Sequence, residues 1–179
     1  TDLGQQSDQV GDSVSYVPLP SGVTVSDMAL GRDHTCVLYD TGDVACWGGN
    51  DYGQLGIGST EDILDESAET LTNISFPSGR YAIDITAGEG FTCALLDNNQ
   101  AICWGLNDVG QLGLGHSNNY GDSSSEPISS LSSISLTATG STTIRTIDAG
   151  YDHVCVALNN NYVKCWGGNL FGHLGIGVS

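Results

Sequence analysis

Six cysteines are the residues of this sequence whose type and spacing most directly indicate chemistry. They fall into three pairs that share one spacing, namely Cys36 and Cys46, Cys93 and Cys103, and Cys155 and Cys165. A cysteine pair can form a disulfide or contribute to a metal site. Because this spacing is longer than the Cys-x-x-Cys pairs of zinc sites and recurs along the chain, we expect one disulfide within each pair.

Disulfides indicate an oxidising compartment, so we expect the protein to be secreted or displayed at the cell surface. The sequence begins at Thr1 without a methionine and without the basic and apolar regions of a signal peptide. We therefore expect that a signal peptide has been removed and that the sequence is an excerpt of a longer protein.

The histidines are the next candidates for a site. His34 and His153 occupy the same position of a repeated segment, where the second copy has Phe91, and His116 and His173 stand alone. A catalytic or metal-binding role shared by the copies would not tolerate that exchange, so we expect packed or hydrogen-bonded histidines. The sequence also has no nucleophile elbow, metalloprotease helix or phosphate-binding loop. We expect no enzyme and no cofactor.

The charge balance limits the partners. The chain has 21 acidic and 4 basic residues, which give a formal net charge of -17. This charge repels a phosphate backbone and an anionic membrane surface, so we expect no nucleic-acid partner. The apolar runs are too short to cross a bilayer, so we expect no membrane insertion. Cationic partners, or no charged partner at all, fit this charge better.

Three polar features remain as candidate sites. The run Glu61-Asp62-Ile63-Leu64-Asp65-Glu66 is interpreted as a solvated acidic loop, with calcium or a basic partner as the alternative. Asp51 and Asp108 could also bind calcium, but the third copy has Leu170 at that position, which argues against a repeated calcium site. Asn73 begins an Asn-Ile-Ser sequence typical of N-glycosylation.

The cysteines lie in a segment that recurs at residues 31–58, 88–115 and 150–177. If the members of a pair face each other, each segment holds a β-hairpin with a three-residue loop. The last loop residue is then Gly42, Asn99 or Asn161, and these residue types tolerate the left-handed conformation that such loops need. The same register places each cysteine pair at a non-hydrogen-bonded site, where a disulfide fits.

Both faces of the hairpin are apolar, so the sheet must be covered on both sides. Val37 and Tyr39 point to one face, and Leu38 and Val44 point to the other. A further strand is expected before each hairpin, at 28–30, 85–87 and 147–149. Short antiparallel sheets that repeat and stack face to face predict an all-β fold of propeller blades with little helix.

The run at 47–58, Trp-Gly-Gly-Asn-Asp-Tyr-Gly-Gln-Leu-Gly-Ile-Gly, resembles the signature of the regulator of chromosome condensation (RCC1) repeat. It recurs at 104–115 and 166–177. The resemblance implies a propeller, usually of seven blades, and the paired cysteines resemble those of secreted microbial members. Since residues that recur in all copies are expected to be scaffold, we assign that role to Trp47, Trp104, Trp166, Asn50, Asn107 and Asn169.

The repeats divide the chain into three units, 1–58, 59–115 and 116–179. The first unit starts in mid-blade, and together the three form one propeller segment. The Ser/Thr-rich linker from Ser117 to Thr143 has few large apolar groups, so we expect it at the surface. Three units cannot close a ring of six to eight blades. We therefore expect further repeats in a longer protein or further copies of the chain that cover the open sheet edges.

These patterns favour a non-enzymatic extracellular module that binds a protein partner or builds a cell-surface assembly or filament. The first alternative, implied only by the resemblance, is a guanine-nucleotide exchange factor for a small GTPase. The second alternative is an inhibitor of a secreted enzyme.

Overall fold

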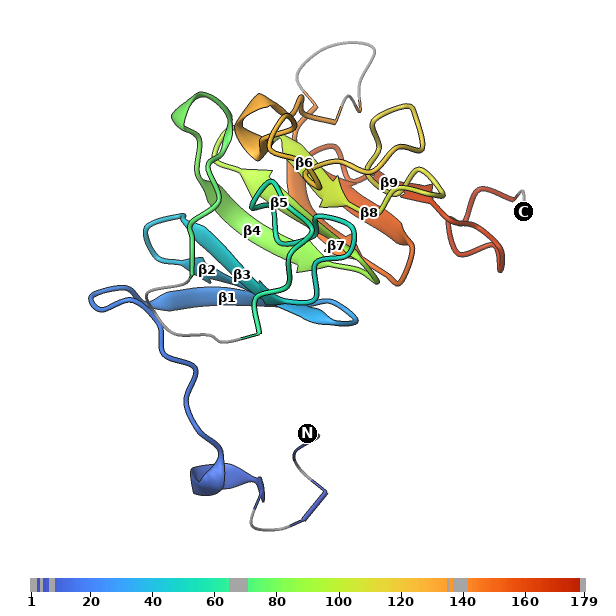
Figure 1. Ribbon diagram of the computed structural model, residues 1–179. Helices are drawn as coiled ribbons and strands as arrows, with labels where there is room; N and C mark the ends of the chain where they lie inside the picture. Colours follow the sequence, from blue (N-terminus) through green and yellow to red (C-terminus); the bar gives the residue numbers. More distant parts are fainter. Residues whose placement is uncertain are drawn as a thin grey trace.

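The computed structural model describes residues 3, 5–6, 9–64, 71–134, 136 and 142–177 and contains three antiparallel sheets (Figure 1). The first blade contains β1 (Val25–Leu30), β2 (His34–Tyr39) and β3 (Val44–Gly48). The second contains β4 (Ala82–Ala87), β5 (Phe91–Leu96) and β6 (Ala101–Gly105). The third contains β7 (Ile144–Ala149), β8 (His153–Leu158) and β9 (Val163–Gly167). This architecture confirms the predicted all-β fold of propeller blades.

Helices among the described residues are single 3-10 turns, namely η2 (Gly11–Ser13), η3 (Pro77–Gly79) and η4 (Ile128–Ser130). None of these turns could span a lipid bilayer.

Each hairpin has the register that its loop residues dictate. Cys36 faces Cys46, and the Tyr39 backbone N–H donates to the Asp43 carbonyl at 2.9 Å, which leaves residues 40–42 as the loop. The third loop residue is left-handed in all blades, with φ of 83° at Gly42, 60° at Asn99 and 67° at Asn161. The second and third blades have equivalent registers because their hairpins have the same three-residue loop with a left-handed last residue.

The three sheets stack in chain order (Figure 1). The disulfide-bearing face of one blade packs against the opposite face of the next. Between the first and second blades, Cys36, Leu38 and Val44 share a buried cluster with Ile102 and Trp104. Between the second and third blades, the cluster joins the disulfide-bearing face of β5 and β6 to the opposite face of β8. Burial of both faces explains why the strands lack a simple alternation of apolar and polar residues.

The linkers between the blades run along the outer strand of each sheet. After the first blade, Ile63 pairs with Gly48, and the Ile74 N–H donates to the Val44 carbonyl at 2.8 Å. After the second blade, Tyr120 pairs with Gly105, and the Ile134 N–H donates to the Ala101 carbonyl at 2.8 Å. Each linker therefore covers the edge of the sheet that precedes it.

The expectation that the linker from Ser117 to Thr143 lies at the surface is wrong for part of it. Ile128, Leu131 and Ile134 are buried in the two clusters between the blades. The linker has few apolar side chains, but these three are spaced so that they insert between the sheets. The low apolar content of the segment gives no indication of this.

Candidate functional site

The tryptophans at the predicted scaffold positions join successive blades. The Trp104 indole N–H donates to the Gln54 carbonyl at 3.0 Å, and the Trp166 indole N–H donates to the Gln111 carbonyl at 3.0 Å. In both cases the acceptor lies in the preceding repeat. Trp47 has no described blade before it.

The asparagines at the predicted scaffold positions hold the loop after the hairpin. The Asn107 amide donates to the carbonyls of His116 and Asn118, both at 2.8 Å, and its oxygen accepts the Leu112 N–H at 3.0 Å. Asn50 makes the same set of bonds in the first repeat, and in the third the Asn169 oxygen accepts the Leu174 N–H. A buried amide with these contacts fixes a loop that has no regular structure of its own.

The six cysteines form three disulfides across the β2–β3, β5–β6 and β8–β9 hairpins, with Cα–Cα distances of 4.1, 4.0 and 4.1 Å. The first two are buried in the clusters between the blades. The third, Cys155–Cys165, is only half-buried, because no described blade follows it.

The polar candidates from the sequence occupy different places. Asp62 accepts the Asn50 N–H at 2.8 Å, as Asn119 accepts the Asn107 N–H at 3.0 Å, so this acid has a structural role in the loop. Asp65 and Glu66, the last two acids of the run, lie outside the described residues, and Glu61 is exposed. Asn73 is exposed, as glycosylation would require.

A hydrogen-bonded histidine lies between the first and second blades. His34 Nε2 lies 2.9 Å from Thr92 Oγ1, and that hydroxyl donates its own proton to the Gln54 carbonyl at 2.9 Å. His34 Nε2 must therefore carry the proton that it shares with Thr92, while its buried Nδ1 has no partner. Burial lowers the pKa of His34 from 6.5 to about 4, although the nearby Asp33 carboxylate acts to raise it.

The corresponding place between the second and third blades is apolar. Phe91 takes the position of His34, Val154 takes the position of Thr92, and both are fully buried in the same cluster. The polar His34 thus contacts a hydroxyl on the next blade, whereas the apolar Phe91 shares its cluster with an apolar residue of the next blade. Thr35 holds the hydroxyl position on the first blade.

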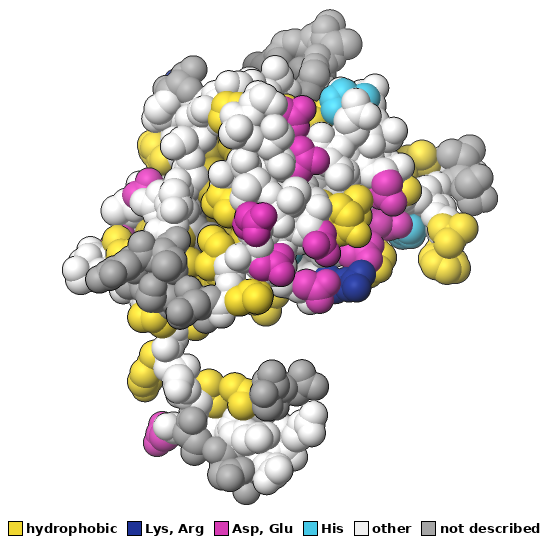
Figure 2. Space-filling model, viewed as in Figure 1, with side chains coloured by type: hydrophobic (Ala, Val, Ile, Leu, Met, Phe, Trp, Pro, Cys, Tyr) yellow, Lys and Arg dark blue, Asp and Glu magenta, His cyan; other side chains and the backbone are white. Residues whose placement is uncertain are grey.

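One end of the blades is charged. Arg32 Nη1 lies 2.6 Å from Glu89 Oε1, and the Tyr151 hydroxyl donates to the same oxygen, so the three repeats each supply one member of this contact. Figure 2 shows acidic side chains in an interrupted band across this view of the blades, with basic atoms beside it. Partly exposed ion pairs of this kind contribute little to stability. The excess of acidic over basic residues makes the protein negatively charged.

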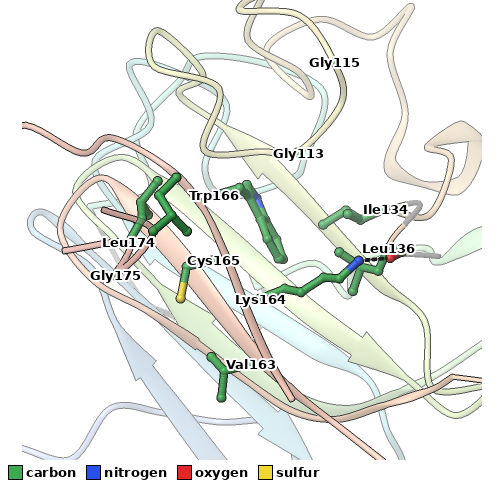
Figure 3. Close-up of a pocket in the computed structure, with 11 residues that line it drawn as sticks. Gly113, Gly115, Ile134, Leu136, Val163, Lys164, Cys165, Trp166, Leu174 and Gly175 are labelled. Carbon is green, nitrogen blue, oxygen red and sulfur yellow. Dashed lines mark hydrogen bonds between the residues drawn. The ribbon is translucent and has the colours of Figure 1, made fainter. Parts of the chain in front are cut away.

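The third blade carries an open groove of about 680 Å³ along β9 (Figure 3). Trp166, Ile134 and Leu136 lie along one part of it and Leu174 along another, and the Lys164 ammonium donates to the Leu136 carbonyl. Val163 is 65% exposed, whereas the equivalent Val44 and Ala101 are fully buried. The groove follows the edge that a linker covers in the other two blades.

The repeats match a family model described as "Regulator of chromosome condensation (RCC1) repeat" at residues 25–54, 82–111 and 144–172. A second model of the same description matches residues 41–95 and 98–157. The chain belongs to the RCC1 repeat family. The resemblance seen in the Trp-Gly-x-Asn signature is thereby confirmed.

Similar RCC1-family sequences come from animals and plants. The chain is 35% identical over 130 residues to a secretion-regulating guanine nucleotide exchange factor of Bos taurus, covering 73% of the chain and 25% of that protein. It is 29% identical over 178 residues to the ultraviolet-B receptor UVR8 of Arabidopsis thaliana, covering 99% of the chain and 36% of that protein. The chain therefore spans about a third or less of these RCC1 relatives.

Solved RCC1-type structures share the fold. Yeast RCC1 (Prp20), determined with Kap60 bound, has a TM-score of 0.61 and 26% identity, covering 84% of the chain and 31% of that structure. Human WBSCR16 has a TM-score of 0.69 and 23% identity, covering 83% of the chain and 35% of that structure. The three blades thus align with about a third of each of these chains.

The sequence did not indicate one cluster of the third repeat. Asp152, His153 and His173 come together there, although His173 lies twenty residues beyond His153 in the chain. The signal that could have found it is the position of His173, where the first two repeats have Gln54 and Gln111.

Proposed function

We propose that this chain is a non-enzymatic protein-interaction or structural module of an extracellular or cell-surface assembly. The observation that carries the proposal is the third blade, whose β9 edge and disulfide-bearing face are left open by the described residues, whereas those of the first two blades are covered. An uncovered sheet edge beside an apolar groove is a surface that pairs with another strand.

The partner that fits this surface is another blade of the same repeat, supplied by further repeats of a longer protein or by a second copy. His153 stands at the position of His34, so the next blade should present a hydroxyl as Thr92 does. Thr35 of a second copy supplies that hydroxyl. The Trp47 indole of that copy corresponds to Trp104, whose N–H donates to the preceding repeat.

The segment before β1 supplies a strand for the open edge. Figure 1 shows this segment extending away from the blades, and its Val10, Tyr16 and Val17 are exposed. Its Gly11-Asp12-Ser13 run repeats Gly121-Asp122-Ser123, which directly follows Tyr120, the residue paired with Gly105. In a second copy the segment would pair beside Gly167 in the same way.

Replacing Val163 with lysine tests this contact, because it places a charge in the groove without disturbing a buried residue. We expect the wild-type protein to show a molar mass in light scattering that rises with concentration. Val163→Lys should weaken self-association about tenfold or more, which corresponds to roughly 1.4 kcal/mol. Ile83→Lys, at an exposed position on β4 of the middle blade and away from both proposed contact faces, should leave it unchanged. A monomer at every concentration, or an unchanged association of Val163→Lys, would contradict assembly through this face.

A regulator of a small GTPase is the second candidate, favoured by the name of the bovine relative. It predicts a protein that works with reduced cysteines, whereas three disulfides, two of them buried, support an oxidising compartment. We expect native protein to show no free thiols in mass spectrometry after alkylation and no acceleration of nucleotide release from a small GTPase. Six alkylated cysteines, or faster release of bound nucleotide, would favour the regulator instead.

A further inference from the structure

We propose that Asp152, His153 and His173 form a binding site for a divalent transition metal such as zinc on the third blade. Within the described residues, these three are the one group of His, Cys, Asp and Glu side chains whose donor atoms all lie within 4.8 Å of one another. Two imidazoles and a carboxylate are ligands that zinc uses in proteins. The inference goes beyond the proposed function, because metal binding by a single chain needs no second blade.

The distances between the donor atoms suit a single ion. Asp152 Oδ1 lies 3.6 Å from His153 Nδ1 and 3.5 Å from His173 Nε2. Ligands at the usual zinc distances occupy tetrahedron corners that are roughly 3.4 Å apart. The imidazole rings of His153 and His173 are also adjacent, with centroids 4.3 Å apart. An ion would therefore require small side-chain adjustments and no rearrangement of the strands.

His153 has a free nitrogen at this place. Its Nδ1 is buried and makes no hydrogen bond, so its lone pair is available to a metal. The other nitrogen, Nε2, stands where His34 Nε2 contacts the next blade, so metal binding and blade contact use different atoms of the ring. Zinc-bound histidines commonly donate their second N–H to a protein or water oxygen.

His173 is the residue that distinguishes this repeat. In the first two repeats a glutamine holds the position, and its side-chain oxygen accepts a loop N–H, at 2.9 Å from Tyr52 and 3.0 Å from Val109. In the third repeat the His173 ring instead turns toward Asp152 and donates to the Gly168 carbonyl. Metal binding would replace that donated proton.

Asp152 is positioned by the glycine that faces it. A side chain at residue 168 would meet Asp152 Oδ2 at 2.2 Å, so only glycine leaves room for the carboxylate to lie against the two imidazoles. The first repeat has Asp33 and His34 at the equivalent positions but Gln54 in place of the second histidine. It therefore offers a natural control with the same scaffold and one imidazole fewer.

Isothermal titration calorimetry with zinc chloride tests the site in tag-free protein with its disulfides formed. We expect one zinc per chain, with imidazole proton signals of His153 and His173 shifting in NMR spectra while those of His34 and His116 stay in place. His173→Gln restores the residue of the other repeats, and His153→Phe inserts the residue of the second, so both variants should fold. Each should weaken zinc binding about 100-fold or more.

His34→Phe is the matched control, because it makes the same exchange on the first blade, and it should bind zinc like the wild type. Circular dichroism of each variant verifies that the fold is retained. Failure of the wild-type protein to bind zinc in a saturable manner, or undiminished binding by folded His173→Gln, would overturn the proposal. Neither result depends on self-association, since the titration reads binding to a single chain.

Discussion

Replacing Trp104 with alanine is expected to lower the free energy of unfolding by about 3 to 5 kcal/mol, the usual cost of deleting a large buried aromatic side chain. Trp104 is fully buried between the first and second blades, and its ring packs edge-on against Phe76 with centroids 6.3 Å apart. The substitution leaves a cavity at the centre of the first cluster and removes the donor to the Gln54 carbonyl. Urea denaturation followed by far-ultraviolet circular dichroism, with disulfides intact, measures the loss.

Trp166→Ala is the control for that experiment. Trp166 makes the same hydrogen bond, to the Gln111 carbonyl, but it is half-buried beside the open groove. Trp166→Ala should lower the free energy of unfolding clearly less than Trp104→Ala does, because less packing is removed. Equal losses for the two variants would mean that the hydrogen bond, and not the burial between blades, dominates the role of this tryptophan.

Acid is expected to destabilise the contact between the first and second blades through His34. Its pKa is lowered from 6.5 to about 4, so the unfolded chain binds a proton more readily than the folded one. The stabilisation that neutral His34 provides is therefore fully present above pH 6.5, the pKa in the unfolded chain. It is lost as the pH falls from 6.5 toward 4. The shift corresponds to about 3 kcal/mol at most. The physical cause is burial of the imidazole, which disfavours its charged form, and a proton added at Nδ1 would have no hydrogen-bond acceptor.

His34→Phe separates this effect from the titration of the many carboxylates. The second repeat accommodates Phe91 at the same position, so the variant should fold. We expect denaturation midpoints of wild type and variant to diverge as the pH is lowered from 6.5 toward 4, with the variant losing less stability. Parallel pH profiles would show that His34 does not titrate in this range.

The sequence predicted the hairpins well because their determinants are local. The spacing of Cys36 and Cys46 and the loop that ends at Gly42 specify one register, and the structure has it. The stacking of blades also followed, because a sheet with two apolar faces must be covered on both. The division into units 1–58, 59–115 and 116–179 remains a prediction.

Contacts between distant segments were harder to predict. The proximity of Asp152 and His173 depends on how the loop after β9 folds back, and nothing in the local sequence encodes that distance. The burial of Ile128 and Leu131 depends on the path of the linker relative to both neighbouring blades. Composition alone placed that segment at the surface.

The alternation between polar and apolar contacts has a consequence for how such arrays can grow by duplication. A copied first repeat would place His34 opposite Thr35, a compatible pair, whereas a copied third repeat would place His153 opposite Val154 and leave a buried imidazole without an acceptor. The repeats are alike in fold but are not interchangeable in order. Each repeat carries one residue that contacts its successor, as His34 does, and one that contacts its predecessor, as Thr92 does.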